Sequence, residues 1–376
     1  MRIFSKLSLI LLPAVILVAP QAPPRIRGAI DLTIGGGENA AKEYTFGSIS
    51  SLALGRDGRI YIADGADQQI RVFSAEGKYQ FSIGGKGAGP GEFGALAAIG
   101  FGPDGMLWAR DEGKSRFEAF SVAANGATYK RLVRIPQTVL GSHQPITFDA
   151  KGNLVDRKGV TNAKGQVDLI YTLDLNDNAV TTDTIPQSPV DSLGVRTVSI
   201  KVDGATNATR YFYQPYGATS VVAFGPQGEW AKGITSRYAI TWHTSATPRT
   251  RVLRQALEGP ALTAEEKSKA QTQLEQTAKS MKLLDADVPF RVPARKPVFY
   301  AMQFSQDGAL WVQRYVSQGK TAEADIYDNT GKLIAIAEWP VGLSLLAYTS
   351  VIQGRTALAV AKDSLDIERV VRVRFR

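Results

Sequence analysis

A short hydrophobic pattern recurs along the chain, in which an apolar run leads through an x-Gly turn into a second apolar or aromatic run. Its copies are LALGRDGRIYIAD, IGFGPDGMLWARD, ITFDAKGNLVD, VVAFGPQGEWAKG, MQFSQDGALWVQR and, most weakly, TSVIQGRTALAVA. Each turn is Asp-Gly, Lys-Gly or Gln-Gly, and glycine adopts a positive φ there without a Cβ clash. The pattern therefore predicts six tight β-hairpins.

The spacing of these hairpins predicts how they are grouped. The turn glycines are Gly58, Gly105, Gly152, Gly228, Gly308 and Gly354, at intervals of 47, 47, 76, 80 and 46 residues. Four-stranded propeller blades repeat roughly every 40–50 residues, so the two long intervals each contain one blade and an insertion. A second hairpin follows the first, as in QIRVFSAEGKYQFSIG, which completes a four-stranded unit. We predict an all-β, six-bladed β-propeller over residues 29–376, with insertions at 187–216 and 256–297.

The last repeat is one strand short, because the chain stops after VVRVRFR with three strands made. Residues 29–34 end at Ile34, which begins the same Ile-Gly-Gly that ends the outer strand of the first unit, YQFSIGG. An antiparallel pairing of Ala29–Ile34 with Val370–Arg374 would close the ring and cover an exposed sheet edge. Duplicated β-sandwiches are the alternative fold, and they do not require this exchange of a terminal strand.

The second insertion contains a helix signal. Thr263 and Glu266 form a capping-box pattern, and Ala270, Leu274, Ala278, Met281 and Leu284 give a narrow apolar stripe up to residue 284. Such a helix could act as a lid or partner-binding element, or it could simply pack on the rim. Both insertions connect one blade to the next, so we expect them on the face that carries the loops between second and third strands.

A family resemblance can be named from one segment. GRIYIADGADQQIRVFSAEGKYQFSIGGKGAGPGEF resembles an NHL-type blade followed by the Gly-Pro-Gly-Glu-Phe connector of bacterial exported six-bladed propellers. The similarity covers residues 46–120 and returns at 308–340. Lys232 and Arg314 occupy the place where the first two blades carry Asp, which departs from a repeating aspartate pattern. The resemblance implies a propeller scaffold, and some six-bladed propellers are metal-dependent hydrolases or lactonases.

The N-terminus has the pattern of a signal peptide over residues 1–22. Arg2 and Lys6 precede an apolar run, Leu7–Val18, that is too short to span a bilayer as a stable helix. Proline follows both Ala19 and Ala22, which leaves the cleavage site undefined and a retained anchor as the alternative. We expect an exported protein, periplasmic or extracellular, with no stable membrane span after processing.

Several polar residues are candidates for a ligand site on the loop face. They are Asp64, Asp111 and Asp156 near the ends of second strands, Arg116, Arg237 and Arg314 in or beside the following loops, and His143 in a connection between blades. The carboxylates could bind calcium or a cationic substrate, or they could cap the following loops by accepting backbone N–H groups. The arginines could bind an anion through bidentate hydrogen bonds, or be solvated or locally paired.

Composition narrows the chemistry. The chain has no cysteine and two histidines, which excludes thiolate metal sites and the multi-histidine metal centres of some propeller enzymes. The formal net charge of +9 favours anionic surfaces in general. Export argues against nucleic-acid binding, which is known among NHL-type propellers.

These observations lead to a functional hypothesis with one alternative. We predict a non-catalytic binding or scaffolding propeller of the cell envelope, monomeric and without a required cofactor. Its partner would be a protein, peptide or polymer bound at the channel face that carries the insertions. The alternative is a calcium-type hydrolase or lactonase, with Asp64, Asp111 and Asp156 as metal ligands.

Overall fold

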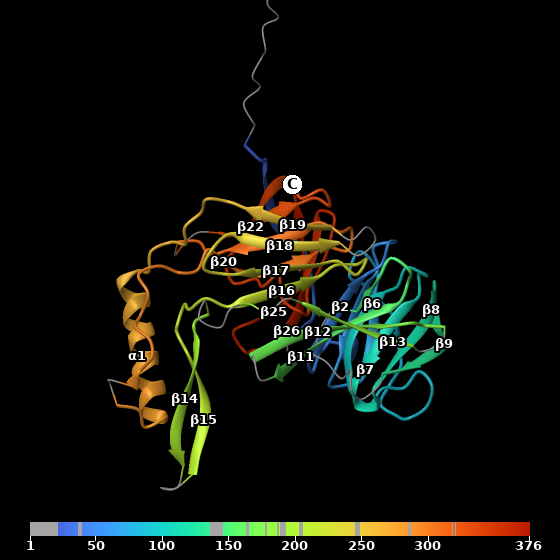
Figure 1. Cartoon of the computed structure of the whole chain (residues 1–376). Helices are drawn as coiled ribbons and strands as arrows, with labels where there is room; N and C mark the ends of the chain where they lie inside the picture. Colours follow the sequence, from blue (N-terminus) through green and yellow to red (C-terminus); the bar gives the residue numbers. More distant parts are fainter. Residues whose placement is uncertain are drawn as a thin grey trace, which may run out of the picture.

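The structure is a computed structural model, and it describes residues 22–36, 40–135, 146–162, 165–176, 179–185, 188, 193–202, 206–244, 249–284, 287–317, 319 and 321–376. The expected signal peptide lies outside these ranges, apart from Ala22. His143 and residues 187 and 189–192 of the first insertion also lie outside them. Figure 1 shows the described strands arranged as blades.

The first three blades follow the chain in order. Blade 1 contains β2 (Ile49–Leu54), β3 (Ile60–Asp64), β4 (Gln69–Phe73) and β5 (Tyr79–Ile83). Blade 2 contains β6 (Leu96–Phe101), β7 (Leu107–Asp111), β8 (Arg116–Ala123) and β9 (Gly126–Arg134). Blade 3 contains β10 (Thr147–Phe148), β11 (Leu154–Asn162), β12 (Gly165–Leu173) and β13 (Val180–Ile185). Two short 3-10 helices, Lys42–Tyr44 and Glu112–Lys114, lie in the connections.

The remaining blades follow the two insertions. Blade 4 contains β16 (Ser220–Phe224), β17 (Trp230–Ile234), β18 (Ala239–Thr244) and β19 (Arg249–Arg254). Blade 5 contains β20 (Phe299–Phe304), β21 (Leu310–Arg314), β22 (Ala322–Tyr327) and β23 (Leu333–Trp339). Blade 6 combines β24 (Val351–Gln353), β25 (Thr356–Lys362) and β26 (Glu368–Phe375) with β1 (Arg25–Ile34). All six turn glycines of the inner hairpins have positive φ, as the repeat predicts.

Strand β1 closes the ring in the predicted register. Ala29 faces Arg374 and Ile34 faces Val370 in an antiparallel pair, with a bulge between Ile30 and Leu32. The strand also begins earlier than predicted, because Arg25–Arg27 pair in parallel with residues 336–338 of β23. A single strand therefore joins blades 5 and 6 into one eight-stranded sheet.

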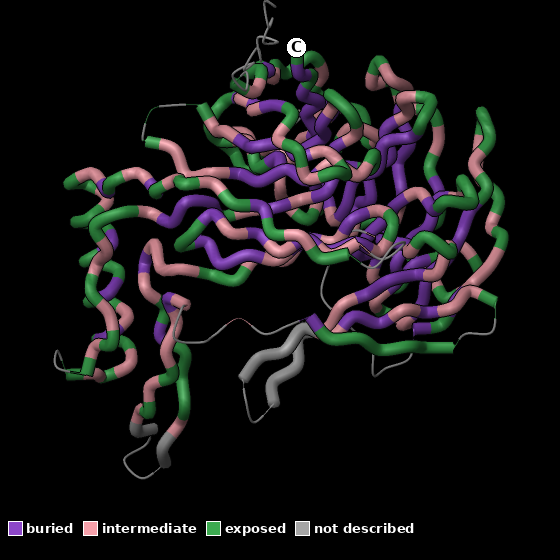
Figure 2. The backbone as a smooth tube through the Cα atoms, turned by 45° about the horizontal axis from the view of Figure 1, so that its top comes forward, coloured by how far each residue is buried: buried purple, intermediate pink, exposed green. Residues whose placement is uncertain are grey.

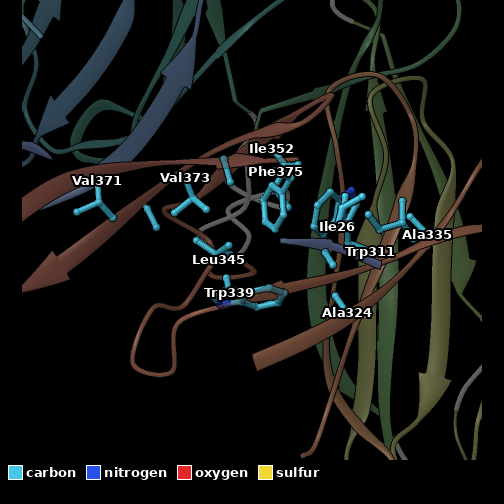
Figure 3. Close-up of a cluster of buried hydrophobic side chains, with 14 residues drawn as sticks. Ile26, Trp311, Ala324, Ala335, Trp339, Leu345, Ile352, Val371, Val373 and Phe375 are labelled. Atoms are coloured by element: carbon cyan, nitrogen blue, oxygen red, sulfur yellow. The ribbon is translucent and has the colours of Figure 1, made fainter. Parts of the chain in front are cut away.

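The hydrophobic core lies between neighbouring blades. At the junction of blades 5 and 6, Trp311 packs edge-to-face against Phe375 with ring centroids 5.2 Å apart, and Ile26 of β1 joins the same cluster (Figure 3). Tyr61 against Phe101 and Trp108 against Phe148 make the equivalent contacts farther round the ring. The aromatic residues three positions after the turn glycines are therefore packing residues between blades.

The two insertions form one projecting unit, here called the arm. It consists of the hairpin β14 (Val195–Val202) and β15 (Thr206–Tyr213), the helix α1 (Ala264–Ser280) and the segment that follows the helix. Phe212 of the hairpin packs with Leu274 and Ala278 of the helix, and its ring lies 6.4 Å from that of Phe290. Figures 1 and 2 show the arm extending to one side of the blades.

The predicted capping box is present at the start of α1. Thr263 Oγ1 accepts from Glu266 N at 3.2 Å, and Glu266 Oε2 accepts from Thr263 N at 2.9 Å. The helix ends at Ser280, so the predicted extent to residue 284 is wrong, and Leu284 is 72% exposed. The stripe ends because Leu283 donates its N–H to Ala278 O in a turn that redirects the chain.

The strand register shows at which end of the blades the second insertion begins. Arg254, the last residue of β19, faces Ala239, the first residue of β18, so the insertion starts beside the loop between β17 and β18. In blade 1 the equivalent loop, between β3 and β4, begins at Asp64. The arm and Asp64 are therefore at the same end of the blades.

Candidate functional site

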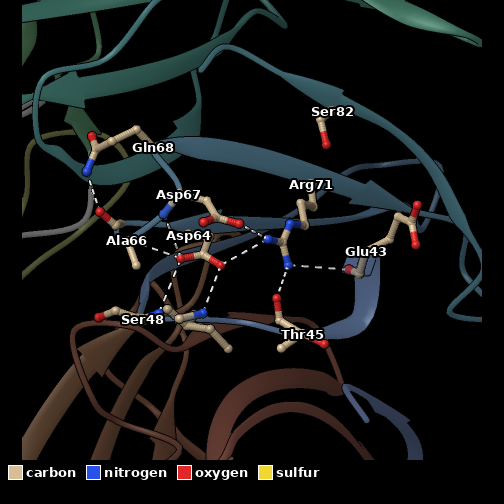
Figure 4. A network of polar contacts seen from close by, with 12 residues as sticks. Glu43, Thr45, Ser48, Asp64, Ala66, Asp67, Gln68, Arg71 and Ser82 are labelled. Carbon is tan, nitrogen blue, oxygen red and sulfur yellow. Dashed lines mark hydrogen bonds and ion pairs between the residues drawn. The ribbon is translucent and has the colours of Figure 1, made fainter. Parts of the chain in front are cut away.

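Asp64 is fully buried at the end of β3 and holds its surrounding loops together (Figure 4). Its carboxylate accepts from the backbone N–H groups of Gly47, Ser48, Ala66 and Asp67 at 3.0–3.3 Å. Arg71 is buried beside it, with 3.3 Å between its guanidinium and the Asp64 carboxylate. All of these contacts are internal, which is the arrangement of a loop cap.

Asp111 has the same role in blade 2. It accepts from the backbone N–H groups of Gly94 and Ala95, and Arg116 Nε lies 3.4 Å from Asp111 Oδ2. Arg116 also pairs with Glu118 at 2.9 Å and donates to the carbonyls of Gly89 and Glu92 in the glycine-rich connector. Burial raises the pKa of Glu118, although Arg116 acts in the opposite direction. An external anion would have to replace these internal partners of Arg116.

Asp156 pairs with an arginine from the preceding blade. Two nitrogen atoms of Arg110, from blade 2, lie 3.1 and 3.2 Å from its carboxylate oxygens, and Arg157 N donates to it at 2.7 Å. Burial raises the pKa of Asp156, and the Arg110 charge partly offsets this effect. The carboxylate ties blade 2 to blade 3 and is not at the strand end occupied by Asp64 and Asp111.

Blades 4 and 5 have other residues where blades 1 and 2 have the capping aspartate. The expectation that Lys232 stands at the Asp64 position is wrong, because Lys232 faces Val222 in mid-strand and Ile234 faces the first residue of β16. The adjacent Thr235 Oγ1 accepts from Thr219 N at 2.9 Å and serves as the cap. In blade 5, Arg314 faces Phe299 just as Asp64 faces Ile49.

Arg314 belongs to a buried polar network between blades 4 and 5. It lies 2.6 Å from Glu323 and 3.2 Å from Asp325. Asp325 Oδ2 accepts from Tyr238 Oη at 2.7 Å and from Gln255 Nε2 at 3.0 Å. Burial raises the pKa of Asp325 despite the neighbouring Arg314, and burial also raises the pKa of Tyr238 well above its usual range. No repeated pattern in the sequence indicates this network.

The other candidate residues, Arg237 and His143, do not join the aspartates in a shared ligand site within the described residues. Arg237 is exposed in the turn between β17 and β18, and His143 lies outside the described residues. Within the part of the chain that the structure describes, no group of three or more His, Asp and Glu residues could hold a metal ion. Asp64, Asp111 and Asp156 therefore do not converge on one cation site.

Three tyrosines form a cluster at the base of the arm that the sequence patterns did not predict. The rings of Tyr300 and Tyr315 are 4.6 Å apart, and those of Tyr216 and Tyr315 are 6.5 Å apart. Lys296 Nζ lies 5.9 Å from the centre of the Tyr216 ring. Tyr216 is far from Tyr300 and Tyr315 in the sequence, and tyrosine is not the repeated residue at their positions, so only the frequent tyrosines beside the insertions, as in YFYQPY and PVFY, hinted at the cluster.

Comparisons with known proteins agree with this architecture. A family model described as a 6-bladed beta-propeller matches residues 40–105. No match was found among curated proteins. Together with the six blades observed, the family match shows that the protein is a six-bladed β-propeller.

Solved structures show distant similarity. One is a protein from Bacteroides fragilis, provisionally named as exported, with 14% identity, a TM-score of 0.48 and coverage of 94% of this chain and 99% of that chain. Another is virginiamycin B lyase from Staphylococcus aureus, with 10% identity, a TM-score of 0.42 and coverage of 92% and 99%. Similarity at this level carries no inference about ligand or reaction. No helix in the described ranges is long and apolar enough to cross a membrane.

Proposed function

We propose that this protein is an exported, non-catalytic binding propeller of the cell envelope that contacts its partner through the face carrying the arm. The observation that supports this most is the packing of two separate insertions into one projecting unit. Phe212 from the first insertion and Leu274 from the second are both buried in it. Inserted segments on a rigid scaffold are common sites of binding, because the scaffold positions them without depending on them.

The surface of the arm supports the same proposal. Tyr211 and Tyr213 are 55% and 64% exposed on the side of β15 opposite to buried Phe212. Tyrosine supplies large, rigid contact area at little cost in side-chain entropy, and it is enriched at binding interfaces. Two such residues on one face of a projecting hairpin are suited to contact a large partner.

The internal contacts of the candidate carboxylates argue against the calcium-type hydrolase. Asp64 and Asp111 are both fully buried, and they accept four and two backbone N–H groups respectively. A calcium ion would have to displace these donors, together with Arg71 and Arg116.

The proposal is tested by cosedimentation with isolated cell envelopes of the source organism. The double variant Tyr211→Glu/Tyr213→Glu adds two charges to the outer face of the arm without touching the Phe212 contact. The control is Ile334→Glu, at an exposed position on β23 away from the arm. We expect the wild type and the control to cosediment and the double variant to stay in the supernatant. Equal cosedimentation of all three proteins, or of none, would contradict the proposal.

A further inference from the structure

The tyrosine cluster at the base of the arm is built from three separate segments. Tyr216 follows β15, Tyr300 lies in β20, and Tyr315 follows β21. Val298 N donates to Thr235 O and Tyr315 N donates to Val298 O, so the start of β20 lies between the loops that follow β17 and β21. The cluster therefore lies at the arm-bearing end of blades 4 and 5, on an innermost strand of the propeller.

Tyr300 is the unusual member of this cluster. It occupies a bulge in the pairing of β20 with β21, between Phe299 and Ala301. The equivalent bulges in blades 1 and 2 carry the small residues Ser50 and Ala97. Tyr300 is 41% exposed, so its ring does not fill the core in the way that other large side chains of these strands do. Ring closure and blade packing give no reason for a large aromatic residue at this position.

Tyr216 is held in a conformation that its side chain disfavours. Its φ is +55°, in the left-handed region that bulky residues rarely adopt. The following turn fixes this geometry, because Gly217 N donates to Gln214 O at 2.8 Å. Residues kept in such conformations are concentrated at ligand-binding and other functional positions.

Two cationic residues beside the cluster, Lys296 and Arg314, have carboxylate partners. Lys296 lies 2.6 Å from Glu266, and Arg314, next to Tyr315, pairs with Glu323 and Asp325. Burial raises the pKa of Tyr315, and it raises that of Tyr300 to about 12, so both phenols stay neutral hydrogen-bonding groups. The cluster therefore offers aromatic faces and hydroxyls with little net charge. An uncharged ligand with apolar C–H faces and hydroxyl groups complements this surface.

The outer face of the arm continues the same chemistry. Strand pairing places Tyr211 opposite Thr197 and Thr209 opposite Ser199, and all four side chains are exposed. Tyr213, on the same face, is three residues from Tyr216 in the chain. Exposed hydroxyl and aromatic residues thus run along the hairpin and end at the cluster.

From these observations we propose that Tyr216, Tyr300 and Tyr315 form a binding site for a neutral polysaccharide chain, with one sugar ring lying against Tyr300 and further rings extending toward the arm. The proposal rests on the binding function proposed above and adds the class of ligand. Sugar rings fit because their C–H faces stack on aromatic rings while their hydroxyls reach the phenols and the threonine and serine hydroxyls.

Affinity electrophoresis of the full chain tests this site. The native gels would contain xylan, hydroxyethylcellulose, mannan or soluble starch as neutral polymers, and polygalacturonate as the acidic one. We expect at least one neutral polymer to retard the wild type, and Tyr300→Ala to reduce that retardation at least tenfold in apparent affinity. Tyr300→Phe should keep most of it, because the ring remains.

The control is Tyr348→Ala, which removes another exposed tyrosine from a connection between blades. It should be retarded like the wild type, and unchanged melting temperatures would show that both alanine variants are folded. The proposal is overturned if no neutral polymer retards the wild type, if only polygalacturonate does, or if Tyr300→Ala is retarded as strongly as the wild type. Envelope cosedimentation that persists in the absence of polysaccharide binding would leave the binding function standing and reject only this ligand class.

Discussion

At the scale of single residues, the aspartates of the first two blades stabilise the loops that surround them. Asp64 accepts four backbone N–H groups and lies against the buried Arg71. The position of Asp64 in the sequence could not show whether it is a loop cap or a calcium ligand, because both roles require a carboxylate at the end of a strand. The partners that decide between them, Gly47 and Arg71, come from other segments of the chain.

Asp64→Ala should therefore damage stability rather than metal binding. Removing one partner of a buried ion pair costs about 3–5 kcal/mol, because the remaining charge is left uncompensated. Asp67→Ala is the matched control, since Asp67 also pairs with Arg71 but is half-exposed, and it should cost about 1 kcal/mol or less. Urea unfolding measures both free energies. A small stability loss in Asp64→Ala, together with loss of stoichiometric calcium, would contradict the cap.

Glu229 should make stability depend on pH. Glu229 is buried in the turn between β16 and β17 of blade 4. Burial raises its pKa even though Gln227 N donates to its carboxylate. A carboxyl group with a raised folded pKa binds its proton more tightly in the folded state, so stability falls as pH rises from its unfolded pKa through its folded pKa. Glu229→Gln removes this loss. Its melting temperature, relative to the wild type, should be higher at pH 8 than at pH 4, and a constant difference would contradict the expectation.

At the scale of elements, the local sequence was sufficient to predict a hairpin or a helix start wherever turn or capping residues determine it. Gly58 and its five equivalents predicted the inner hairpins, and Thr263 with Glu266 predicted the start of α1. The parallel pairing of Arg25–Arg27 with β23 was not predictable, because these residues carry no copied motif and the contact depends on how blade 5 sits beside blade 6. The packing of Phe212 against Leu274 likewise depends on where two distant insertions meet.

Truncation of the N-terminus tests the role of β1. Deleting residues up to Ala22 should leave the unfolding midpoint unchanged, whereas deleting residues up to Gly36 should lower it markedly. The longer deletion removes the buried side chains of Ile26 and Ile34, worth about 3–6 kcal/mol in burial, and exposes the edge of β26.

A third truncation separates the two pairings of β1. Deleting residues up to Arg27 removes the parallel contact with β23, the buried side chain of Ile26 and the backbone hydrogen bonds between Arg27 and Arg376, but keeps the antiparallel pairing of Gly28–Ile34 with β26, and it should give an intermediate midpoint. Circular dichroism melting of the three proteins measures the order. Equal midpoints for all three would mean that β1 contributes nothing to ring stability.

At the scale of the whole molecule, a closed ring supports an arm that the ring does not need. Each blade junction has its own core, and the arm has a separate one around Phe212 and Leu274. The turns of the inner hairpins lie at the other end of the blades and are short, with Arg56 exposed in the first of them. This asymmetry between the two faces underlies the functional proposal.

The most direct test of that proposal compares the two faces in one measurement. A photo-crosslinking amino acid is placed at Leu284 on the arm or at Arg56 on the opposite face, and each protein is irradiated with isolated cell envelopes of the source organism. Mass spectrometry then counts the adducts. We predict adducts from position 284 and none above background from position 56. Adducts from position 56 alone, or equal yields from both positions, would contradict a binding role for the arm-bearing face.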